Sequence, residues 1–300
     1  MSTVPKVQMA PKGPVFSSLV QGYWRLAEWN MSPQQRLSFI KEHVALGVTT
    51  IDHAHIYGRP SCEQLFGEAL AIDPILRDKI EIISKCGISL ADSGKVAHYN
   101  SSKESILSSV EKSLKRLGTE YLDVLLIHRP DFLMDADEIA EAFSKLKQEG
   151  MVNHFGVSNF TSAQLSLLQS RLEVPLVTNQ IEINPINLDV FESGLLEDLQ
   201  RVRMRPMAWS CLGGGEIFSE KSEDMEGLRN KLHELVGELG AKSIDQVIYA
   251  WVMRAPANPL PILGSGNIDR VRAAVESLEL NINNEQWYRV WSASKGHDVP

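Results

Sequence analysis

The stretch 32–58, SPQQRLSFIKEHVALGVTTIDHAHIYG, holds a helical pattern followed directly by a strand-like run. Leu37, Ile40 and Val44 recur at helical spacing and predict one apolar helix face, which ends at Gly47. The β-branched run that follows the glycine ends in a group of polar side chains. A helix that leads through one glycine into a strand is typical of α/β folds.

The same unit recurs from one end of the chain to the other. We expect strands at 15–22, 49–54, 81–86, 124–129, 154–158, 177–183, 205–210 and 259–264, with helical patterns between them. Capping boxes predict helix starts at Ser32/Gln35, Ser101/Glu104, Thr161/Gln164 and Ser243/Gln246. Eight strands with no long linker or composition break favour a single-domain (β/α)8 TIM barrel over residues 1–300, rather than a two-domain doubly wound sheet.

Composition and charge restrict the partners. The formal charge of −8 argues against nucleic acid or an anionic membrane as a partner, because either would need a concentrated basic face. Residues 1–13 lack the apolar core of a signal peptide, and no run reaches membrane-spanning length. Cys62, Cys86 and Cys211 form no CxxC pair, so neither a disulfide framework nor a structural zinc site is indicated. We therefore expect a cytoplasmic protein without a metal, in which Cys86 packs as an inert side chain.

Two segments exceed a minimal barrel repeat. Residues 211–227 begin CLGGGEIF, and three glycines before Ile217 and Phe218 predict a mobile flap at the mouth after the seventh strand. A merely long connection fits the same residues. Residues 281–300 form a tail that contains Trp287, Tyr288 and Trp291.

Four side chains able to move a proton lie at the ends of three consecutive predicted strands: Asp52 and Tyr57, then Lys85, then His128. Barrel enzymes carry their chemistry at the carboxyl ends of the strands, so we expect these groups to meet. A phenol is a poor proton donor at neutral pH unless a nearby ammonium lowers its pKa, and that ammonium needs a carboxylate to hold it. An imidazole can orient a carbonyl oxygen. The set predicts a carbonyl-reducing site.

Other interpretations of these residues stay open. His53 and His55 form an HisXHis pair on one side of a strand, as in metal-dependent hydrolases, although the eighth strand, PLPILGSG, supplies no histidine or acid. Lys85 can form a Schiff base, as in a class I aldolase, if it is desolvated. Each polar residue can also simply satisfy the backbone at a strand end.

The chain resembles the aldo-keto reductase family through GVTTIDHAHIYG at 47–58, LLIHRP at 125–130 and GVSNF at 156–160. GYWR at 22–25, TNQIE at 178–182 and PILGSG at 261–266 bring it close to the YdhF-like bacterial oxidoreductases. The resemblance covers essentially the whole chain. It implies an NADP-dependent oxidoreductase that reversibly reduces an aldehyde or ketone to an alcohol by hydride transfer.

The resemblance also implies a role for each proton-transfer residue. Tyr57 would be the general acid, and Lys85 the cation that lowers its pKa. Asp52 would be the partner of Lys85, and His128 would orient the substrate. These roles agree with what each side chain can do chemically.

No GxGxxG motif follows the first predicted strand, so a Rossmann domain is not indicated. The resemblance implies that Ser158, Asn159 and Gln180 hold the nicotinamide carboxamide. Trp209 occupies the usual tyrosine position and would stack on the nicotinamide ring. The rest of the cofactor site would be lined by Gly22, Tyr23, Asp52, Ser210, Cys211, Leu212 and Gly213.

The phosphate end of the cofactor is expected at GSGNIDR, 264–270, where a strand gives way to a helix near Ile268. Glycines permit close backbone approach, and a helix N-terminus presents free N–H groups to an anion. Ser265 and Arg270 match the family's serine and arginine for the 2′-phosphate of NADP. The chain departs from the family at Ala273–Ala274 and at Gly264, where a lysine is frequent. We expect NADP (NADPH) rather than NAD, bound by Gly264, Ser265, Gly266 and Arg270.

The substrate pocket is expected to draw on Trp24, Trp29, His55, Arg129 and the loop 211–220. We expect a monomer that acts on a small aldehyde or ketone. A rival from another class is a nucleotide-sensing barrel with little turnover. The intact set of four proton-transfer residues weighs against this rival.

Overall fold

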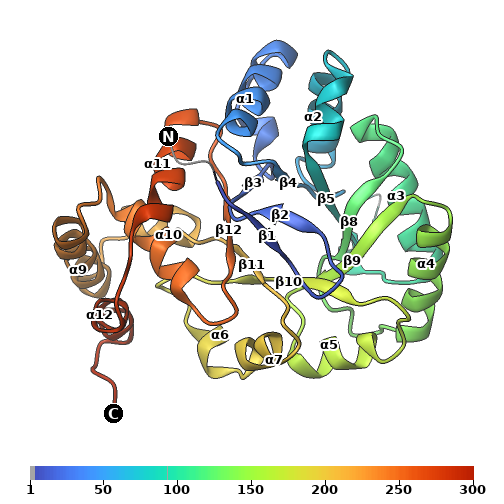
Figure 1. Ribbon diagram of the computed structural model, residues 1–300. Helices are drawn as coiled ribbons and strands as arrows, with labels where there is room; N and C mark the ends of the chain where they lie inside the picture. Colours follow the sequence, from blue (N-terminus) through green and yellow to red (C-terminus); the bar gives the residue numbers. More distant parts are fainter. Residues whose placement is uncertain (1–3, 93) are drawn as a thin grey trace.

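A computed structural model describes residues 4–92 and 94–300, so residues 1–3 of the N-terminal stretch lie outside the described residues. Eight parallel strands form a closed barrel inside a ring of helices (Figure 1). Each strand pairs with the next along the chain, and the last pairs with the first. The predicted (β/α)8 barrel is confirmed, with strands β3 (Val20–Gly22), β4 (Thr50–Asp52), β5 (Glu81–Cys86), β8 (Leu122–Ile127), β9 (Val152–Ser158), β10 (Leu176–Glu182), β11 (Met207–Trp209) and β12 (Leu260–Leu263).

Helices follow the strands around the outside of the barrel. In the crossovers between barrel strands lie α1 (Pro33–Ala45), α2 (Ser61–Leu70), α3 (Lys103–Leu117), α4 (Ala136–Gln148), α5 (Ser162–Gln169), α6 (Asp189–Glu192), α7 (Leu195–Arg201) and α10 (Ile244–Arg254), and α11 (Ile268–Glu276) follows β12. Short 3-10 turns are η1 (Leu26–Glu28), η2 (Pro74–Lys79), η3 (Gly213–Gly215) and η4 (Ser277–Glu279). No helix among the described residues is both long and apolar enough to cross a membrane.

The first predicted strand, 15–22, is two strands, so this prediction was wrong in detail. β1 (Lys6–Gln8) and β2 (Val15–Ser17) form an antiparallel hairpin that crosses the barrel opening in Figure 1. The Ser17 hydroxyl donates to Leu19 O at 2.6 Å and accepts from Thr50 N at 3.0 Å, which turns the chain before β3 begins. The turn falls at Ser17 and Ser18, which interrupt the apolar residues of the predicted run.

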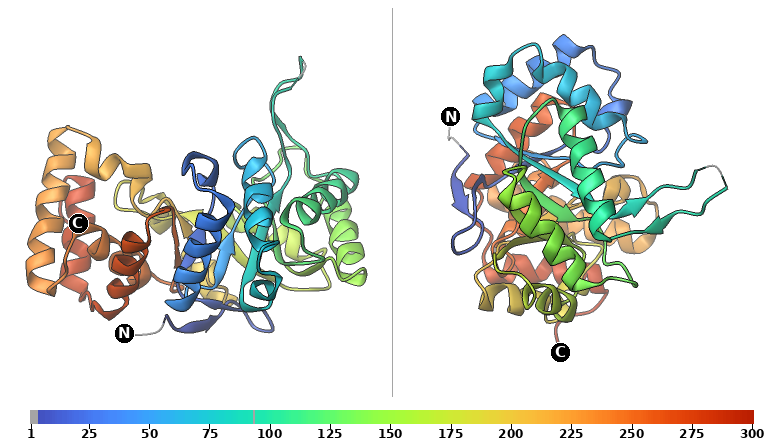
Figure 2. Two further views of the ribbon diagram at one scale, coloured as in Figure 1. Left: turned by 90° about the horizontal axis from the view of Figure 1, so that it is seen from above. Right: turned by 90° about the vertical axis from the view of Figure 1, so that its right-hand side faces the viewer.

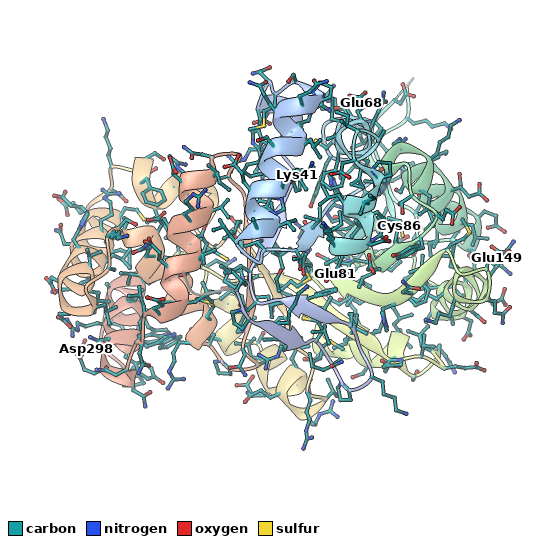
Figure 3. The ribbon with its side chains drawn as sticks, turned by 45° about the horizontal axis from the view of Figure 1, so that its top comes forward. Lys41, Glu68, Glu81, Cys86, Glu149 and Asp298 are labelled. Carbon is teal, nitrogen blue, oxygen red and sulfur yellow. The ribbon has the colours of Figure 1, made fainter. Side chains whose placement is uncertain are left out.

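The buried apolar side chains form two layers because strand side chains alternate between faces. Ile83 lies inside the barrel with Met9 and Phe16 of the N-terminal hairpin, while Ile82 packs outward against the helices. Figure 3 labels Glu81 and Cys86, the first and last residues of β5. Alternation from Ile83 places Lys85 on the inner face of the barrel.

Two of the predicted capping boxes are confirmed, at the starts of α1 (Ser32) and α5 (Thr161). The box at Ser101 is wrong, because Ser101 N and Oγ both donate to Asp131 Oδ2 at 3.0 Å. The N-cap of α3 is therefore the next residue, Ser102.

The box at Ser243 is also wrong. The Ser243 side chain makes no cap bond, and Gln246 Oε1 instead accepts from Lys242 N at 2.8 Å. A box that the sequence reading missed, at Asn283 and Gln286, starts α12 (Asn284–Lys295).

Three further segments lie outside the basic strand–helix repeat of the barrel. β6 (Ile88–Ser89) and β7 (His98–Tyr99) belong to a hairpin that projects far from the barrel in both views of Figure 2. The segment 211–227 contains η3 and α8 (Glu216–Ser219), and its predicted mobility stays a prediction. The tail forms α12, which lies beside α9 (Glu223–Leu239) in Figure 1.

Two buried histidines lie in the outer layer beside β4. His43 in α1 is fully satisfied: its Nδ1 lies 2.7 Å from Val48 O and its Nε2 lies 2.8 Å from the Tyr23 hydroxyl. His53 stacks on Tyr23 at 5.2 Å, and neither of its ring nitrogens has a hydrogen-bond partner in the described chain. Burial lowers the pKa of His43 to about 4 and that of His53 to about 3, so both rings are neutral.

We predict opposite results when the two histidines are replaced by phenylalanine. His43→Phe leaves the buried Tyr23 hydroxyl and Val48 carbonyl unpaired, and should lower the free energy of unfolding by about 1–3 kcal/mol at pH 7. His53→Phe removes only unpartnered nitrogens and should change it by less than about 1 kcal/mol. Urea unfolding of both variants measures the difference, and an equal loss would contradict it.

The acid dependence of unfolding gives a second test of His53, through its low pKa. The unfolded histidine has a pKa of about 6.5 and binds a proton more readily than the buried, neutral ring. The stability that the neutral ring contributes is therefore present above this unfolded pKa and is lost as the pH falls toward the folded pKa. Between pH 7 and pH 5 the loss through His53 is about 2 kcal/mol. Unfolding of His53→Phe should be less acid-sensitive than unfolding of the wild type by about that amount. Identical pH slopes would contradict the assigned pKa.

Gly67 of α2 lies where that helix meets the end of α3. A Cβ at this position would lie 2.1 Å from Arg116 O, which is backbone and cannot turn aside. Gly67→Ala should therefore cost about 1–3 kcal/mol of unfolding free energy. Gly237→Ala in α9 is the matched control, because its Cβ would meet nothing within 4 Å and should add about 0.5–1 kcal/mol. Thermal unfolding compares the two, and destabilisation by both would contradict the packing argument.

Candidate active site

The Lys85 ammonium is the centre of a buried polar cluster. Its Nζ donates to Asp52 Oδ1 and Oδ2 at 2.8 Å, to His53 O at 2.8 Å and to the Tyr57 hydroxyl at 3.0 Å. The Lys85 side chain is 0% exposed. The site therefore brings three of the four predicted proton-transfer groups into direct contact.

The ends of β4 and β5 place these groups. Asp52 is the last residue of β4 and faces the barrel interior, as Lys85 does near the end of β5. Beyond β4 the chain turns, with Tyr57 N donating to Ala54 O at 3.0 Å, and this turn brings the phenol over the ammonium. Strand alternation and one tight turn are enough to assemble the cluster.

The electrostatics of the cluster differ in one respect from the expectation. Burial disfavours the charged form of Lys85, but Asp52 and Tyr57 outweigh burial and raise the pKa of the ammonium. Burial also raises the pKa of Tyr57, and although Lys85 opposes this, it does not reverse it. Lys85 therefore lowers the Tyr57 pKa as expected, but burial outweighs this effect and the net shift is upward. The phenol is protonated at neutral pH.

His128 completes the set at the end of β8. Its backbone N donates to Cys86 O at 2.9 Å, and its ring meets the Tyr57 ring edge to face with centroids 5.7 Å apart. Burial first, and then Lys85, hold the pKa of His128 well below its usual value, so the ring is neutral. Its Nδ1 has no hydrogen-bond partner within residues 4–92 and 94–300.

A second polar group lies beside this cluster. Gln180 Nε2 donates to Asp52 Oδ1 at 2.8 Å, and the Ser158 hydroxyl donates to Gln180 O at 2.9 Å. Asn159 Nδ2 donates to Ser158 Oγ at 2.8 Å, while Trp209 Nε1 donates to Asn159 Oδ1 at 3.0 Å. The predicted carboxamide residues and the predicted stacking ring therefore form one connected network.

A cavity of about 1180 Å³ opens over both groups and runs to the loop after β12. Most predicted site residues line it: Asp52, Tyr57 and His128 at the proton-transfer end; Ser158, Asn159, Gln180, Trp209, Ser210, Cys211 and Leu212 in the middle; Gly264, Ser265, Gly266 and Arg270 at the far end; and Trp24, Trp29, Arg129 and Phe218 at the sides. Lys85 lies beneath this surface, fully covered.

Besides Lys85, the predicted residues Gly22, Tyr23, His55 and Gly213 lie off the cavity lining. The Tyr23 side chain is buried and points to His43, and Gly213 packs against Ile186. His55 lies with Nδ1 2.6 Å from Lys85 O and Nε2 2.8 Å from Ile88 O, so it ties β5 to the projecting hairpin. Gly22 belongs to the barrel wall, where a Cβ would come within 2.8 Å of Ile262 Cγ2.

The far end of the cavity has the chemistry of a phosphate site. A Cβ at Gly266 would lie 2.5 Å from the Trp29 ring, so only glycine fits there. α11 begins after Asn267, and Arg270 in its first turn makes no ion pair in the described part of the chain. An uncommitted guanidinium, a glycine cradle and a helix start fit a phosphate.

Sequence reasoning missed one cation at this end. Arg25 stacks on Trp24 at 4.5 Å, and its Nη2 would lie 3.4 Å from a Cβ at Gly264. The Arg25 guanidinium therefore occupies the space beside Gly264 into which a longer side chain at position 264 would extend. The signal was present in GYWR, where a cation follows a pocket tryptophan.

The competing interpretations fit this geometry poorly. An ammonium kept charged by a carboxylate and enclosed on all sides is not a nucleophile for a Schiff base. His53 faces the aromatic outer layer and His55 faces two carbonyl oxygens, so their nitrogens do not converge on one point. Cys86 is a free, buried thiol whose pKa burial raises to about 12, as its predicted packing role requires.

Comparison with known proteins gives consistent similarities over nearly the whole chain. A model described as the aldo/keto reductase family matches residues 18–295. The oxidoreductase YdhF of Escherichia coli is 54% identical over 299 residues, which cover 99% of this chain and 100% of YdhF. A 6-dehydroglucose reductase of Agrobacterium fabrum is 40% identical, over 94% of this chain and 96% of its own length.

Solved structures share the fold. A crystal structure of an aldo/keto reductase from Klebsiella pneumoniae in complex with NADP and acetate superposes with a TM-score of 0.76. The alignment covers 95% of this chain and 94% of that chain, at 23% identity.

Proposed function

Because the chain belongs to the aldo/keto reductase family, we propose that it reduces an aldehyde or ketone to the alcohol with NADPH, reversibly, and that Tyr57 supplies the proton. The observation that carries this proposal is the contact of the Tyr57 hydroxyl with the buried Lys85 ammonium, which Asp52 holds in turn. These groups lie at one end of a cavity of about 1180 Å³, whose lining extends to Ser265 and Arg270.

The residues near the substrate carbonyl have separate roles in the reaction. Tyr57 is protonated at neutral pH and donates its proton to the carbonyl oxygen as the alcohol forms. Lys85, 3.0 Å from the phenol oxygen, stabilises the phenolate left behind, and Asp52 keeps the ammonium in place. His128 is neutral and beside Tyr57, so it can donate one hydrogen bond that orients the same oxygen.

The cofactor assignment rests on the residues along the cavity. NADPH, when bound, supplies the hydride. Ser158, Asn159 and Gln180 offer the amide and hydroxyl groups that suit a carboxamide, and Trp209 offers a ring to stack on. Ser265 and Arg270 offer donors for the 2′-phosphate. The NADP complex of the related Klebsiella pneumoniae protein supports NADP rather than another cofactor.

Two further expectations belong to this proposal. We infer that the enzyme acts in the cytoplasm, which its three free buried cysteines support. We also infer that it acts as a monomer. One barrel contains all four proton-transfer groups, which supports a single chain as the working unit.

Replacing the phenol tests the proton donor. Tyr57→Phe should lower kcat for aldehyde reduction by about 10²-fold or more, because the hydroxyl contributes to proton transfer and not to cofactor binding. The NADPH dissociation constant, measured by tryptophan fluorescence, should change little. Tyr288→Phe, at a half-exposed position on α12, is the control and should keep wild-type kcat. Near-normal turnover by Tyr57→Phe would refute the assigned acid.

Removing the distant cation tests the cofactor preference. Arg270→Ala should raise the NADPH dissociation constant by about 10–150-fold and change that of NADH much less, because a hydrogen bond to a charged group contributes about 1.5–3 kcal/mol. The titration needs no turnover. Equal weakening of both cofactors, or of neither, would show that Arg270 does not select the 2′-phosphate.

A further inference from the structure

Besides Arg25 and Arg270 at the phosphate end, a third guanidinium lines the cavity nearer its proton-transfer end. Arg129 directly follows His128 and is partly buried, and its Cζ lies 5.4 Å from the centroid of the Trp209 ring. Its charge opposes protonation of His128 and favours the phenolate of Tyr57, so it is electrostatically coupled to both. The cation therefore lines the same cavity as Tyr57 and His128, close enough to act on both electrostatically.

No acid in the described chain neutralises Arg129. Among the described residues its side chain forms no ion pair or hydrogen bond, and it lies over the Trp209 ring in a cation–π contact. Asp131, two residues on, binds Ser101 and the backbone N of Leu133 with its two oxygens. Glu182, at the end of β10, accepts from Asn184 and Asn187.

The other charges near Tyr57 cancel one another. The Lys85 ammonium lies 2.8 Å from both oxygens of the Asp52 carboxylate, so this pair carries no net charge. Arg129 is then a cation without an ion-pair partner among the described residues, and it is partly buried, where charge interactions are stronger than in water. A guanidinium held beside an aromatic ring presents a planar fork of donors that matches a carboxylate or a phosphate.

We propose that Arg129 recognises an anionic oxygen group on the substrate, a carboxylate or a phosphate, placed a few bonds from the carbonyl that Tyr57 protonates. This inference rests on the proposed function and names the substrate class within it. Arg129 is a specificity residue: it binds the end of the substrate that does not react. The best substrates are then anionic aldehydes or ketones, rather than their neutral analogues.

Matched pairs of substrates test the proposal. 4-Carboxybenzaldehyde and its methyl ester differ by one charge, and glyceraldehyde 3-phosphate and glyceraldehyde differ by the phosphate. The wild type should prefer the anionic member of at least one pair by about 10–100-fold in kcat/KM, mainly through KM. The pair with the larger preference distinguishes a carboxylate from a phosphate. No preference in either pair would overturn the proposal.

Variants of Arg129 assign the preference to this side chain. Arg129→Gln should lower the ratio of anionic to neutral kcat/KM by about 10–100-fold, and Arg129→Lys should restore part of it, because it keeps the charge but loses the planar fork. Arg25→Gln is the matched control: it lies at the phosphate end of the cavity and should leave this ratio unchanged. An equal fall of the ratio in both variants would contradict the assignment.

A binding measurement separates this inference from the proposed function. Calorimetry with benzoate and benzamide, which cannot be reduced, should detect tighter binding of the anion to the wild type and equal binding of the two to Arg129→Gln. Anion binding without reduction of any carbonyl would contradict the proposed function and support the anion site at Arg129. Reduction of neutral and anionic carbonyls alike, without anion binding, would overturn the anion site and leave the proposed function in place.

Discussion

The buried ion pair between Lys85 and Asp52 is the constraint on which the site depends. A lysine with no exposed surface is stable only if its charge is matched and its three donor directions are filled, and here two carboxylate oxygens, a backbone carbonyl and a phenol fill them. These partners come from the end of β4 and the turn after it, while Lys85 itself lies on the adjacent β5. The register of β4 against β5 is therefore coupled to the chemistry, because a slip of one residue would turn either charge out of the barrel.

Much of this arrangement could be predicted from the sequence. Eight strand runs that alternate with helical patterns predicted the barrel, since few other folds accommodate that alternation in one domain. The meeting of Asp52, Tyr57, Lys85 and His128 followed from one rule, that barrel strands present their carboxyl ends at a common face. The family that the motifs indicated is confirmed over residues 18–295.

What escaped prediction depends on contacts between distant segments. The break between β2 and β3 is made by the Ser17 hydroxyl reaching Thr50, and no local pattern reports such a bond. The start of α3 moved by one residue because Asp131, thirty positions further on, captured Ser101. The position of Arg25 beside Gly264 joins the two ends of the chain. The net pKa of Tyr57 depends on burial, which a list of neighbouring charges does not contain.

The N-terminal hairpin, β1 and β2, closes one end of the barrel, and the cavity opens at the other end. Met9 and Phe16 pack among the inner side chains below the ion pair, and both are 0% exposed. Within the described residues, Lys85 and Asp52 have no contact with solvent on that side, and the phenol of Tyr57 lies between the ammonium and the cavity. A proton that leaves Tyr57 must therefore be replaced through the mouth from which the alcohol departs. Reprotonation of the enzyme and release of its product then use the same opening of the barrel.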